Sequence, residues 1–221
     1  MATNTLQTFT AFYDGWLLRH HRLQEQLSAV DNVKEEELNK LVEQASIHYG
    51  EYYQEKSNAI DKDVFLICSP PWYTSFEKAL FWVSEFPPSL LFRFVSDLNL
   101  TAEQARRVET VRVETARKEL EIGEAMAMVQ ESLAAAPLYG LVNRTDRLVD
   151  GQVSELDDAM EEVKEAMRMV MAKADGLRVT TVMEILEVLE VAKRVKFFAA
   201  VGEFRIRARR IGLQMEGGVS V

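Results

Sequence analysis

Few side chains in this sequence are of a type and spacing that could do chemistry. The chain has three histidines, His20, His21 and His48, and one cysteine, Cys68. Because adjacent helical positions point about 100° apart, His20 and His21 are poorly placed to hold one metal ion together. The sequence contains no glycine-rich phosphate loop, no nucleophile elbow and no pair of cysteines or histidines at metal-ligand spacing. It therefore predicts a protein that is not an enzyme, with no metal and no cofactor.

Two polar residues accompany an apolar helical stripe that is rich in tyrosine. His48 lies on that stripe between Ala45 and Tyr52, and a hydrogen-bonded core histidine is favoured over a ligand or a proton-transfer residue. Lys56 follows one turn after Tyr52, and a surface lysine with a buried stem is favoured over a buried ion-pair partner. Neither residue by itself indicates a reaction.

Three carboxylates recur at every third position, Glu184, Glu187 and Glu190, which suggests a metal-binding ridge of the di-iron bundle kind. That chemistry also needs Glu-x-x-His pairs, and His48 is the last histidine in the chain. A solvated or ion-paired stripe is therefore favoured, and a helical metalloenzyme is the least favoured function. Cys68 adjoins an apolar run and is interpreted as a small buried hydrophobe rather than a nucleophile.

Charge is distributed unevenly along the chain. An acidic block comprises Glu155, Asp157, Asp158, Glu161, Glu162 and Glu165. A basic end of the last predicted helix comprises Lys193, Arg194, Lys196, Arg205, Arg207, Arg209 and Arg210. Two interpretations are equally favoured: the two groups pair within the molecule, or the basic end forms a surface for an acidic partner.

If the basic end is an interaction surface, the residues expected to carry it are Lys193, Lys196, Arg205, Arg207, Arg209 and Arg210. Their apolar neighbours also give this helix the composition of a calmodulin target or of a helix that binds an anionic surface. These neighbours are Val195, Phe197, Phe198, Phe204 and Ile206. A methionine cluster is interpreted as core filling rather than as an adaptable binding groove, and it comprises Met126, Met128, Met160, Met167, Met169 and Met171.

Composition limits the classes of function. The chain of 221 residues has a formal net charge of -9, which disfavours direct binding to a nucleic-acid backbone. A single cysteine allows no internal disulfide, and the polar N-terminal stretch lacks the apolar run of a secretion signal, so a nuclear or cytoplasmic location is expected. The most apolar stretch, residues 179–201, is interrupted by charged side chains and is expected not to span a membrane.

Helical periodicity dominates the chain. Apolar residues recur at three- and four-residue steps over residues 9–30 and 38–52, which predicts two long helices that pair. All five prolines lie between Pro70 and Pro137, so short helices are expected only in the middle of the chain. Strand-like alternation is absent. The predicted fold is all-α: a single-domain multi-helix bundle with long N- and C-terminal helices and a proline-interrupted middle.

Local signals predict the helix ends. Thr74 or Ser75 is expected to cap a short helix, and Thr101 with Gln104 has the spacing of a capping box that starts a long one. A further helix is expected over about 153–173, ended by Asp175-Gly176, and the last helix over about 180–212. The domain is expected to comprise residues 5–213, followed by a flexible tail over 214–221.

Several segments combine into a distinctive pattern. They are Phe12–Leu17 (FYDGWL), His48–Lys56 (HYGEYYQEK), Ser69–Trp82 (SPPWYTSFEKALFW), Pro88–Leu90, Leu100–Gln104, Gln130–Ala134 and Ala174–Thr181 (ADGLRVTT). In this order they resemble the plant delay-of-germination (seed dormancy control) domain, which also forms the C-terminal part of TGA-type transcription factors. The motif residues expected to be architectural are Trp16, His48, Tyr49, Tyr52, Trp72, Glu77, Trp82, Asp175 and Arg178.

The resemblance implies a non-enzymatic plant regulatory protein that acts through protein contacts in dormancy and germination, abscisic-acid signalling or transcription co-regulation. The implied partners are a signalling protein such as a phosphatase, or a transcriptional co-regulator, with calmodulin and a second copy of the chain as further candidates. The alternatives are a helical sensor that binds an apolar small molecule such as a lipid, and a pollen-aperture-type family member.

Two family properties are not expected here. TGA factors carry a basic leucine zipper before this domain, whereas the resemblance here begins near residue 9 without a basic region ahead of it, so autonomous DNA recognition is not inherited. Haem binding is associated with the dormancy branch and would need C-terminal histidines, which the chain lacks.

Overall fold

The computed structural model describes residues 2–30, 34–134, 140 and 150–217. Within these ranges the chain is helical and has no strand, apart from an isolated β-bridge between Trp82 and Glu85. The predicted all-α fold is therefore confirmed. Its long N- and C-terminal helices and its short middle helices are confirmed as well.

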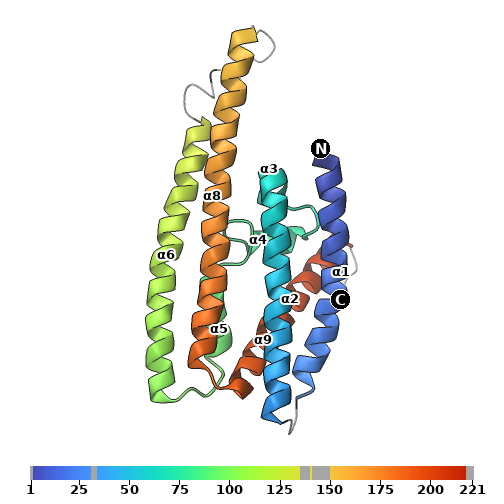
Figure 1. Cartoon of the computed structure of the whole chain (residues 1–221), viewed down its shortest axis with the longest axis vertical. Helices are drawn as coiled ribbons and strands as arrows, with labels where there is room; N and C mark the ends of the chain where they lie inside the picture. Colours follow the sequence, from blue (N-terminus) through green and yellow to red (C-terminus); the bar gives the residue numbers. More distant parts are fainter. Residues whose placement is uncertain (1, 31–33, 135–139, 141–149, 218–221) are drawn as a thin grey trace.

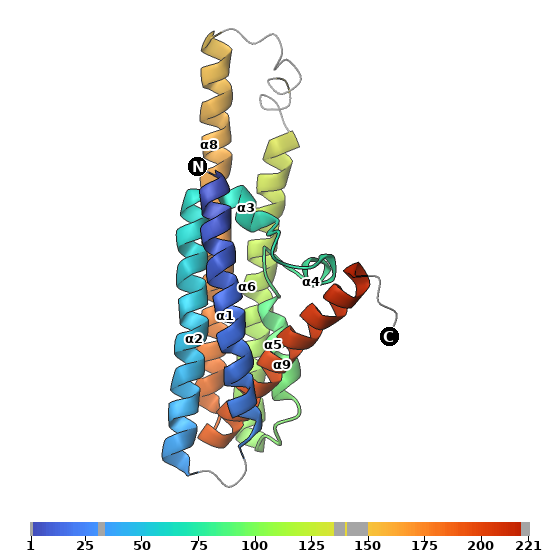
Figure 2. The ribbon, with the colours of Figure 1, turned by 90° about the vertical axis from the view of Figure 1, so that its right-hand side faces the viewer.

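Two pairs of long antiparallel helices form the frame of the molecule (Figure 1). The first pair is α1 (Ala2–Ser28) with α2 (Glu35–Lys62), as the periodicity predicted. The second pair is α6 (Ala102–Ala134) with α8 (Asp150–Val188). One end of the α6–α8 pair projects beyond the rest of the molecule (Figures 1 and 2). We call the half of the pair that includes this end the arm; it comprises residues 119–134 of α6 and 150–168 of α8.

Short helices connect the two pairs. They are α3 (Val64–Cys68), α4 (Ser75–Ala79), a 3-10 turn (Pro88–Leu90) and α5 (Leu91–Val95). Thr74 starts α4 with a complete capping box, because its hydroxyl accepts from the Glu77 amide while the Glu77 carboxylate accepts from the Thr74 amide. Thr101 and Gln104 make the same reciprocal pair at the start of α6, at 3.1 and 3.2 Å. The predicted N-terminal signals are thus confirmed.

The last helix, α9 (Val191–Glu216), contacts the α1–α2 pair and two of the short helices. It packs against α1, α2, α4 and α5, and its C-terminal half swings away from the long pairs toward α4 (Figure 2). Gly212 allows this approach, since a Cβ atom there would lie 2.0 Å from the Thr74 hydroxyl oxygen. The Glu216 carboxylate then accepts from the Ser75 amide at 2.6 Å.

Two predicted helix boundaries are wrong: the end of one helix at Asp175-Gly176 and the start of the last helix near residue 180. Asp175-Gly176 does not end a helix, because α8 continues through it to Val188. The chain instead breaks at Leu189-Glu190, where there is neither glycine nor proline.

Side-chain hydrogen bonds satisfy two backbone carbonyls at this break. The Gln104 amide donates to the Val188 carbonyl at 3.1 Å, and the Arg194 guanidinium donates to the Leu189 carbonyl at 2.8 Å. Both carbonyls lie at the end of α8, where no later amide of the same helix can donate to them.

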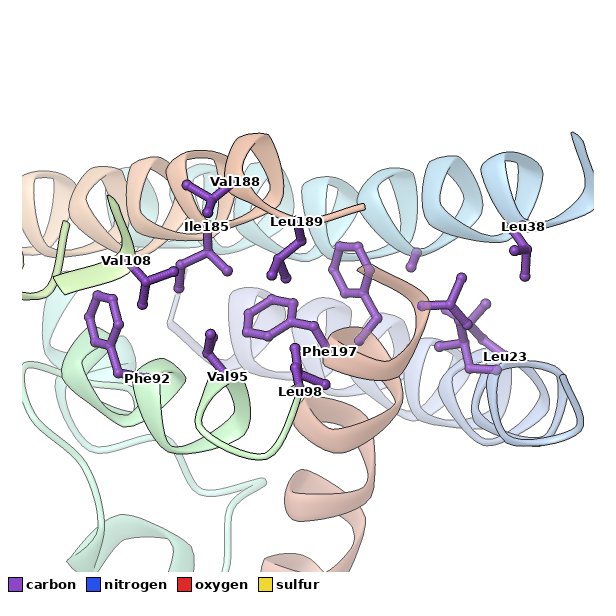
Figure 3. Close-up of a cluster of buried hydrophobic side chains, with 14 residues drawn as sticks. Leu23, Leu38, Phe92, Val95, Leu98, Val108, Ile185, Val188, Leu189 and Phe197 are labelled. Atoms are coloured by element: carbon purple, nitrogen blue, oxygen red, sulfur yellow. The ribbon is translucent and has the colours of Figure 1, made fainter. Parts of the chain in front are cut away.

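Buried apolar side chains form a nearly continuous core along the frame. The cluster in Figure 3 joins α1, α2, α5 and α6 to the junction of α8 and α9, where Phe197 and Leu189 are almost fully buried. A second cluster joins α1, α2 and α3 to α8 and is rich in aromatic rings, among them Tyr13, Trp16 and Tyr52. This core fixes the turn between α8 and α9 against the α1–α2 pair.

The last helix ends a few residues later than predicted. Helix α9 extends to Glu216, so residues 214–216 of the predicted tail are helical. Residues 218–221 of that tail, and Pro137, lie outside the described ranges. Among the described helices, none is both long enough and apolar enough to cross a bilayer.

Candidate functional site

A buried ion pair joins α9 to the turn that precedes the 3-10 helix. The Arg205 guanidinium donates to the Glu85 carboxylate at 2.8 Å, and the two side chains are 12% and 1% exposed. The guanidinium carbon lies 5.5–5.8 Å from the ring centres of four aromatic residues, a range suited to cation–π attraction. These residues are Trp16, Tyr49, Tyr52 and Phe86. The charge of Arg205 is therefore balanced inside the protein by one carboxylate and four ring faces.

Two tyrosines complete the surroundings of Glu85. The Tyr52 hydroxyl donates to the free carboxylate oxygen at 2.6 Å, so it accepts from the Tyr73 hydroxyl, 2.8 Å away. Burial alone would raise the pKa of the Glu85 carboxyl, but Arg205, Lys56 and Arg178 together with this hydrogen bond hold that pKa below its ordinary value. Glu85 is thus a buried carboxylate rather than a neutral acid.

Arg178 holds the turn on which Glu85 stands. The turn places Val83 and Ser84 at φ values of 45° and 63°, which are unfavourable for residues other than glycine. The Arg178 side chain donates to the carbonyls of Phe86, Val83 and Glu85 at 2.8, 2.9 and 3.1 Å, and also to the Trp82 carbonyl. These bonds satisfy the carbonyls of a strained turn and fix the position of the Glu85 carboxylate.

Asp175 connects this turn to α2. Its carboxylate accepts from Arg178 at 2.6 Å and from Lys56 at 2.8 Å. The Lys56 side chain is 2% exposed, so the predicted surface position is wrong and the buried ion-pair alternative is correct. The prediction was wrong because Asp175, the partner of Lys56, lies 119 residues away in the sequence. Burial lowers the pKa of the Lys56 ammonium, and the Asp175 charge opposes that effect.

His48 is the hydrogen-bonded core histidine that the sequence predicted. Its Nε2 lies 3.2 Å from Nδ1 of His20, and both imidazoles stack on the Trp16 ring at centroid distances of 4.4 and 4.8 Å. Burial and neighbouring arginine charges lower the pKa of His20 to about 3 and that of His48 to about 4. The pair is therefore neutral near pH 7, with one nitrogen donating to the other.

The six expected interaction residues do not share one surface. Arg205 lies in the interior, Arg209 is half-buried, and Lys193 donates to Gln104 of α6. Arg209 donates to the Trp72 carbonyl at 2.9 Å and lies 3.5 Å from the Glu77 carboxylate. The exposed members are Lys196, Arg207 and Arg210.

Three apolar neighbours of the basic end lie in the core. Val195, Phe197 and Phe198 are buried in the core. Calmodulin could therefore use them only if α9 left the bundle.

Among the described residues, no ion pair joins the acidic block to the basic end. Glu161 and Glu165 instead pair with Lys164 and Arg168 of their own helix. The acidic block lies on the arm. Residues 119–134 hold four acidic and no basic side chains, and residues 150–168 hold seven acidic and two basic ones, an excess as large as the net charge of the chain. The molecule therefore concentrates its negative charge on the arm.

The motif residues expected to be architectural lie in or beside the core. Trp16, Tyr52, Glu77 and Arg178 are each at most 3% exposed. Glu85, the carboxylate at the centre of the polar network, was not predicted. The only sequence signal for Glu85 is a carboxylate between aromatic residues. That signal does not identify Arg205 as the partner.

The structure also describes the surroundings of the candidate metal ligands, of Cys68 and of the methionine cluster. Within the described ranges, no cluster of three or more His, Cys, Asp or Glu side chains could hold a metal ion. Burial raises the pKa of the Cys68 thiol, which opposes formation of a nucleophilic thiolate. Met167 and Met171 fill the core as predicted, whereas Met128 and Met169 are 65% and 53% exposed.

Comparison with known proteins places the chain in a family. The model of the DOG1 family, described as seed dormancy control, matches residues 19–97. The Arabidopsis thaliana protein RESPONSE TO ABA AND SALT 1 is 37% identical over 94% of this chain and 96% of its own length. The chain belongs to the DOG1 seed dormancy control family. The resemblance inferred from its motifs is thereby confirmed.

Other relatives agree with this DOG1 assignment. Protein ZW2 of Arabidopsis thaliana is 34% identical over 96% of this chain and 99% of its own length. The Triticum aestivum transcription factor HBP-1b(c38) is 26% identical over 96% of this chain, but the match covers only 65% of that longer protein. The DOG1 domain is thus shared between proteins of this length and plant transcription factors.

Loss of the buried carboxylate charge should strongly destabilise the fold. We expect Glu85→Gln to lower the free energy of unfolding by about 3–5 kcal/mol, because Arg205 would stay buried without its counter-charge. Urea denaturation followed by circular dichroism measures this. The control Glu203→Gln breaks the exposed pair with Arg207, and a change below about 1 kcal/mol is expected. Equal effects of the two substitutions would contradict this account.

The histidine pair should make stability depend on pH. Both folded-state pKa values lie below the ordinary 6.5, so between about pH 6.5 and pH 4 the unfolded chain binds protons that the folded chain does not. Stability should fall on acidification through this window. From pH 7 to pH 5 the wild type should lose about 2–4 kcal/mol more than a His20→Asn/His48→Asn variant. Urea titrations at each pH would test this, with the exposed His21→Asn as the control for removal of a histidine outside the pair.

Proposed function

We propose that this DOG1-family protein is a non-enzymatic plant regulator that acts by binding other proteins. The observation that carries the proposal is the similarity to RESPONSE TO ABA AND SALT 1 over nearly the full length of both chains. That name connects the relative to abscisic acid and salt. We propose that this chain acts in a process of the same kind: dormancy and germination, abscisic-acid signalling or transcription co-regulation.

The arrangement of polar residues supports binding rather than catalysis. Arg205 pairs with Glu85, and Lys56 pairs with Asp175; both buried ion pairs join segments that are distant in the sequence, and such pairs hold a fold together. Exposed residues remain available for contacts, including apolar side chains such as Leu213, which is 52% exposed. The proposed partner is a protein phosphatase or a transcriptional co-regulator, encountered in the nucleus or cytoplasm.

An affinity experiment with a purified partner tests this proposal. The folded chain should retain at least one phosphatase or co-regulator from plant extract, and the purified pair should then bind in isothermal titration calorimetry. A variant with Lys196, Arg207 and Arg210 changed to glutamate is the matched surface control, and it should weaken an acidic partner in a salt-dependent way. If no purified candidate binds the wild-type chain, the proposal is wrong.

A second candidate function is binding of an apolar small molecule. A cavity of about 470 Å³ lies between α2, α8, α9 and residues 85–94, and its lining is mainly apolar. The Tyr49 hydroxyl belongs to a residue of this lining, is buried and has no hydrogen-bond partner among the described residues. Burial raises the pKa of Tyr49 to about 12, so the hydroxyl is a neutral donor for one polar group of a lipid-like ligand.

Native mass spectrometry tests the second candidate. A bound acyl or isoprenoid compound should add mass to the wild-type protein and raise its melting temperature. Val201→Phe places a larger side chain in the cavity and should abolish both effects, whereas Leu120→Phe, at an exposed position on α6, should preserve them. Absence of bound mass and of a thermal shift in the wild type would exclude this function.

A further inference from the structure

An open groove of about 480 Å³ lies between α1 and α9. Its α1 side runs from Tyr13 to His21 and its α9 side from Arg205 to Gln214. Figure 2 shows α9 crossing beside α1 before its C-terminal half turns away. We call this feature the α1–α9 groove. It lies on the part of α9 where the sequence had suggested an interaction surface.

The groove has an aromatic floor and apolar walls. Tyr13, Trp16 and Tyr73 are each at most 4% exposed and form the floor. The walls include Leu17 and Ile206, which are half-buried, and Leu213, which is 52% exposed. An exposed leucine next to two half-buried aliphatic side chains leaves apolar area that a partner can cover.

Positive charge accompanies this apolar surface. Arg210 is exposed, lines the groove and forms no ion pair among the described residues. Arg209 lies beside it, and its nearest carboxylate, that of Glu77, is 3.5 Å away and already accepts from the amide and the hydroxyl of Thr74. Arg205 is held by Glu85 and is not available. Arg209 is likewise engaged, by the Trp72 carbonyl and by Glu77, which also lines the groove. Arg210 is therefore the groove arginine that, among the described residues, has no carboxylate partner and can pair with a ligand.

The charge elsewhere in the molecule favours an acidic ligand at this groove. The arm carries the excess negative charge, so it repels an acidic partner while the groove attracts it. The α1 side of the groove covers eight residue steps, or about 12 Å of helix. That length matches about two turns of a docked helix, whose apolar anchors recur at three- and four-residue spacing.

We propose that the α1–α9 groove binds an acidic amphipathic helix of a partner protein. Apolar side chains of that helix cover Leu17, Ile206 and Leu213, and a carboxylate of the helix lies beside Arg210. This inference rests on the proposed function, since it names the chemistry of the partner. The proposal also gives two neighbouring arginines different roles, because Arg210 lines the groove and Arg207 does not.

Two synthetic peptides of about 18 residues provide the probe. One carries leucines at helical spacing with glutamates on the other positions, and the second has lysines in place of the glutamates. Fluorescence anisotropy with the full chain should show at least about tenfold tighter binding of the glutamate peptide, weakening as salt rises. Arg210→Glu should reduce that affinity about tenfold or more.

The matched control is Arg207→Glu, which makes the same charge change at an exposed position three residues away on the same helix. It should leave the affinity within about twofold of wild type. Leu213→Ser should weaken binding without changing the salt dependence, and thermal denaturation should show that all three variants are folded.

Equal binding of the two peptides, or equal losses in Arg207→Glu and Arg210→Glu, would overturn the groove proposal. If a purified partner still binds the wild type under those results, the proposed function stands and only the groove assignment fails. If the glutamate peptide binds at the groove but no purified protein partner binds, the proposed function fails.

Discussion

The ion pair between Arg205 and Glu85 is the interaction on which the arrangement of the other helices depends. It joins the last helix to a turn 120 residues earlier, and both charges are removed from water. Burying two charges costs several kcal/mol per ion unless other groups compensate. Here Tyr52 donates to the carboxylate, and four aromatic rings surround the guanidinium. The aromatic richness of the N-terminal helices therefore has an electrostatic role as well as an apolar one.

The pair also requires a turn of unusual shape. Glu85 reaches Arg205 from a segment in which Val83 and Ser84 adopt positive φ angles, and Arg178 stabilises that segment through its carbonyl oxygens. Asp175 orients Arg178 and is shared with Lys56 of α2. One connected set of charges thus ties α2, α8, α9 and the turn together. Such a set specifies a single arrangement, because each member left alone would be a buried unpaired charge.

Helix α9 has a different environment on its two sides. Arg205 and Phe86 line both the apolar cavity and the α1–α9 groove, so the buried ion pair separates the two. The start of α9 is held by the core and its end by α4, through Gly212 beneath Thr74 and Glu216 at Ser75.

The sequence by itself determined the all-α fold, the α1–α2 pair, a cap at Thr74 or Ser75 and another at Thr101, and membership of the family. These features depend on periodicity, on capping chemistry within three residues, or on motif order, all of which are local in the chain. Only the tertiary structure decided that Lys56 is buried, that α8 continues past Gly176, and that Arg205 is internal while Arg210 is exposed. The positions of Lys56 and Arg205 each depend on a distant partner: Asp175 lies 119 residues from Lys56, and Glu85 lies 120 residues from Arg205. A buried charge and a surface charge have the same local sequence signature, and the position of the opposite charge in space distinguishes them.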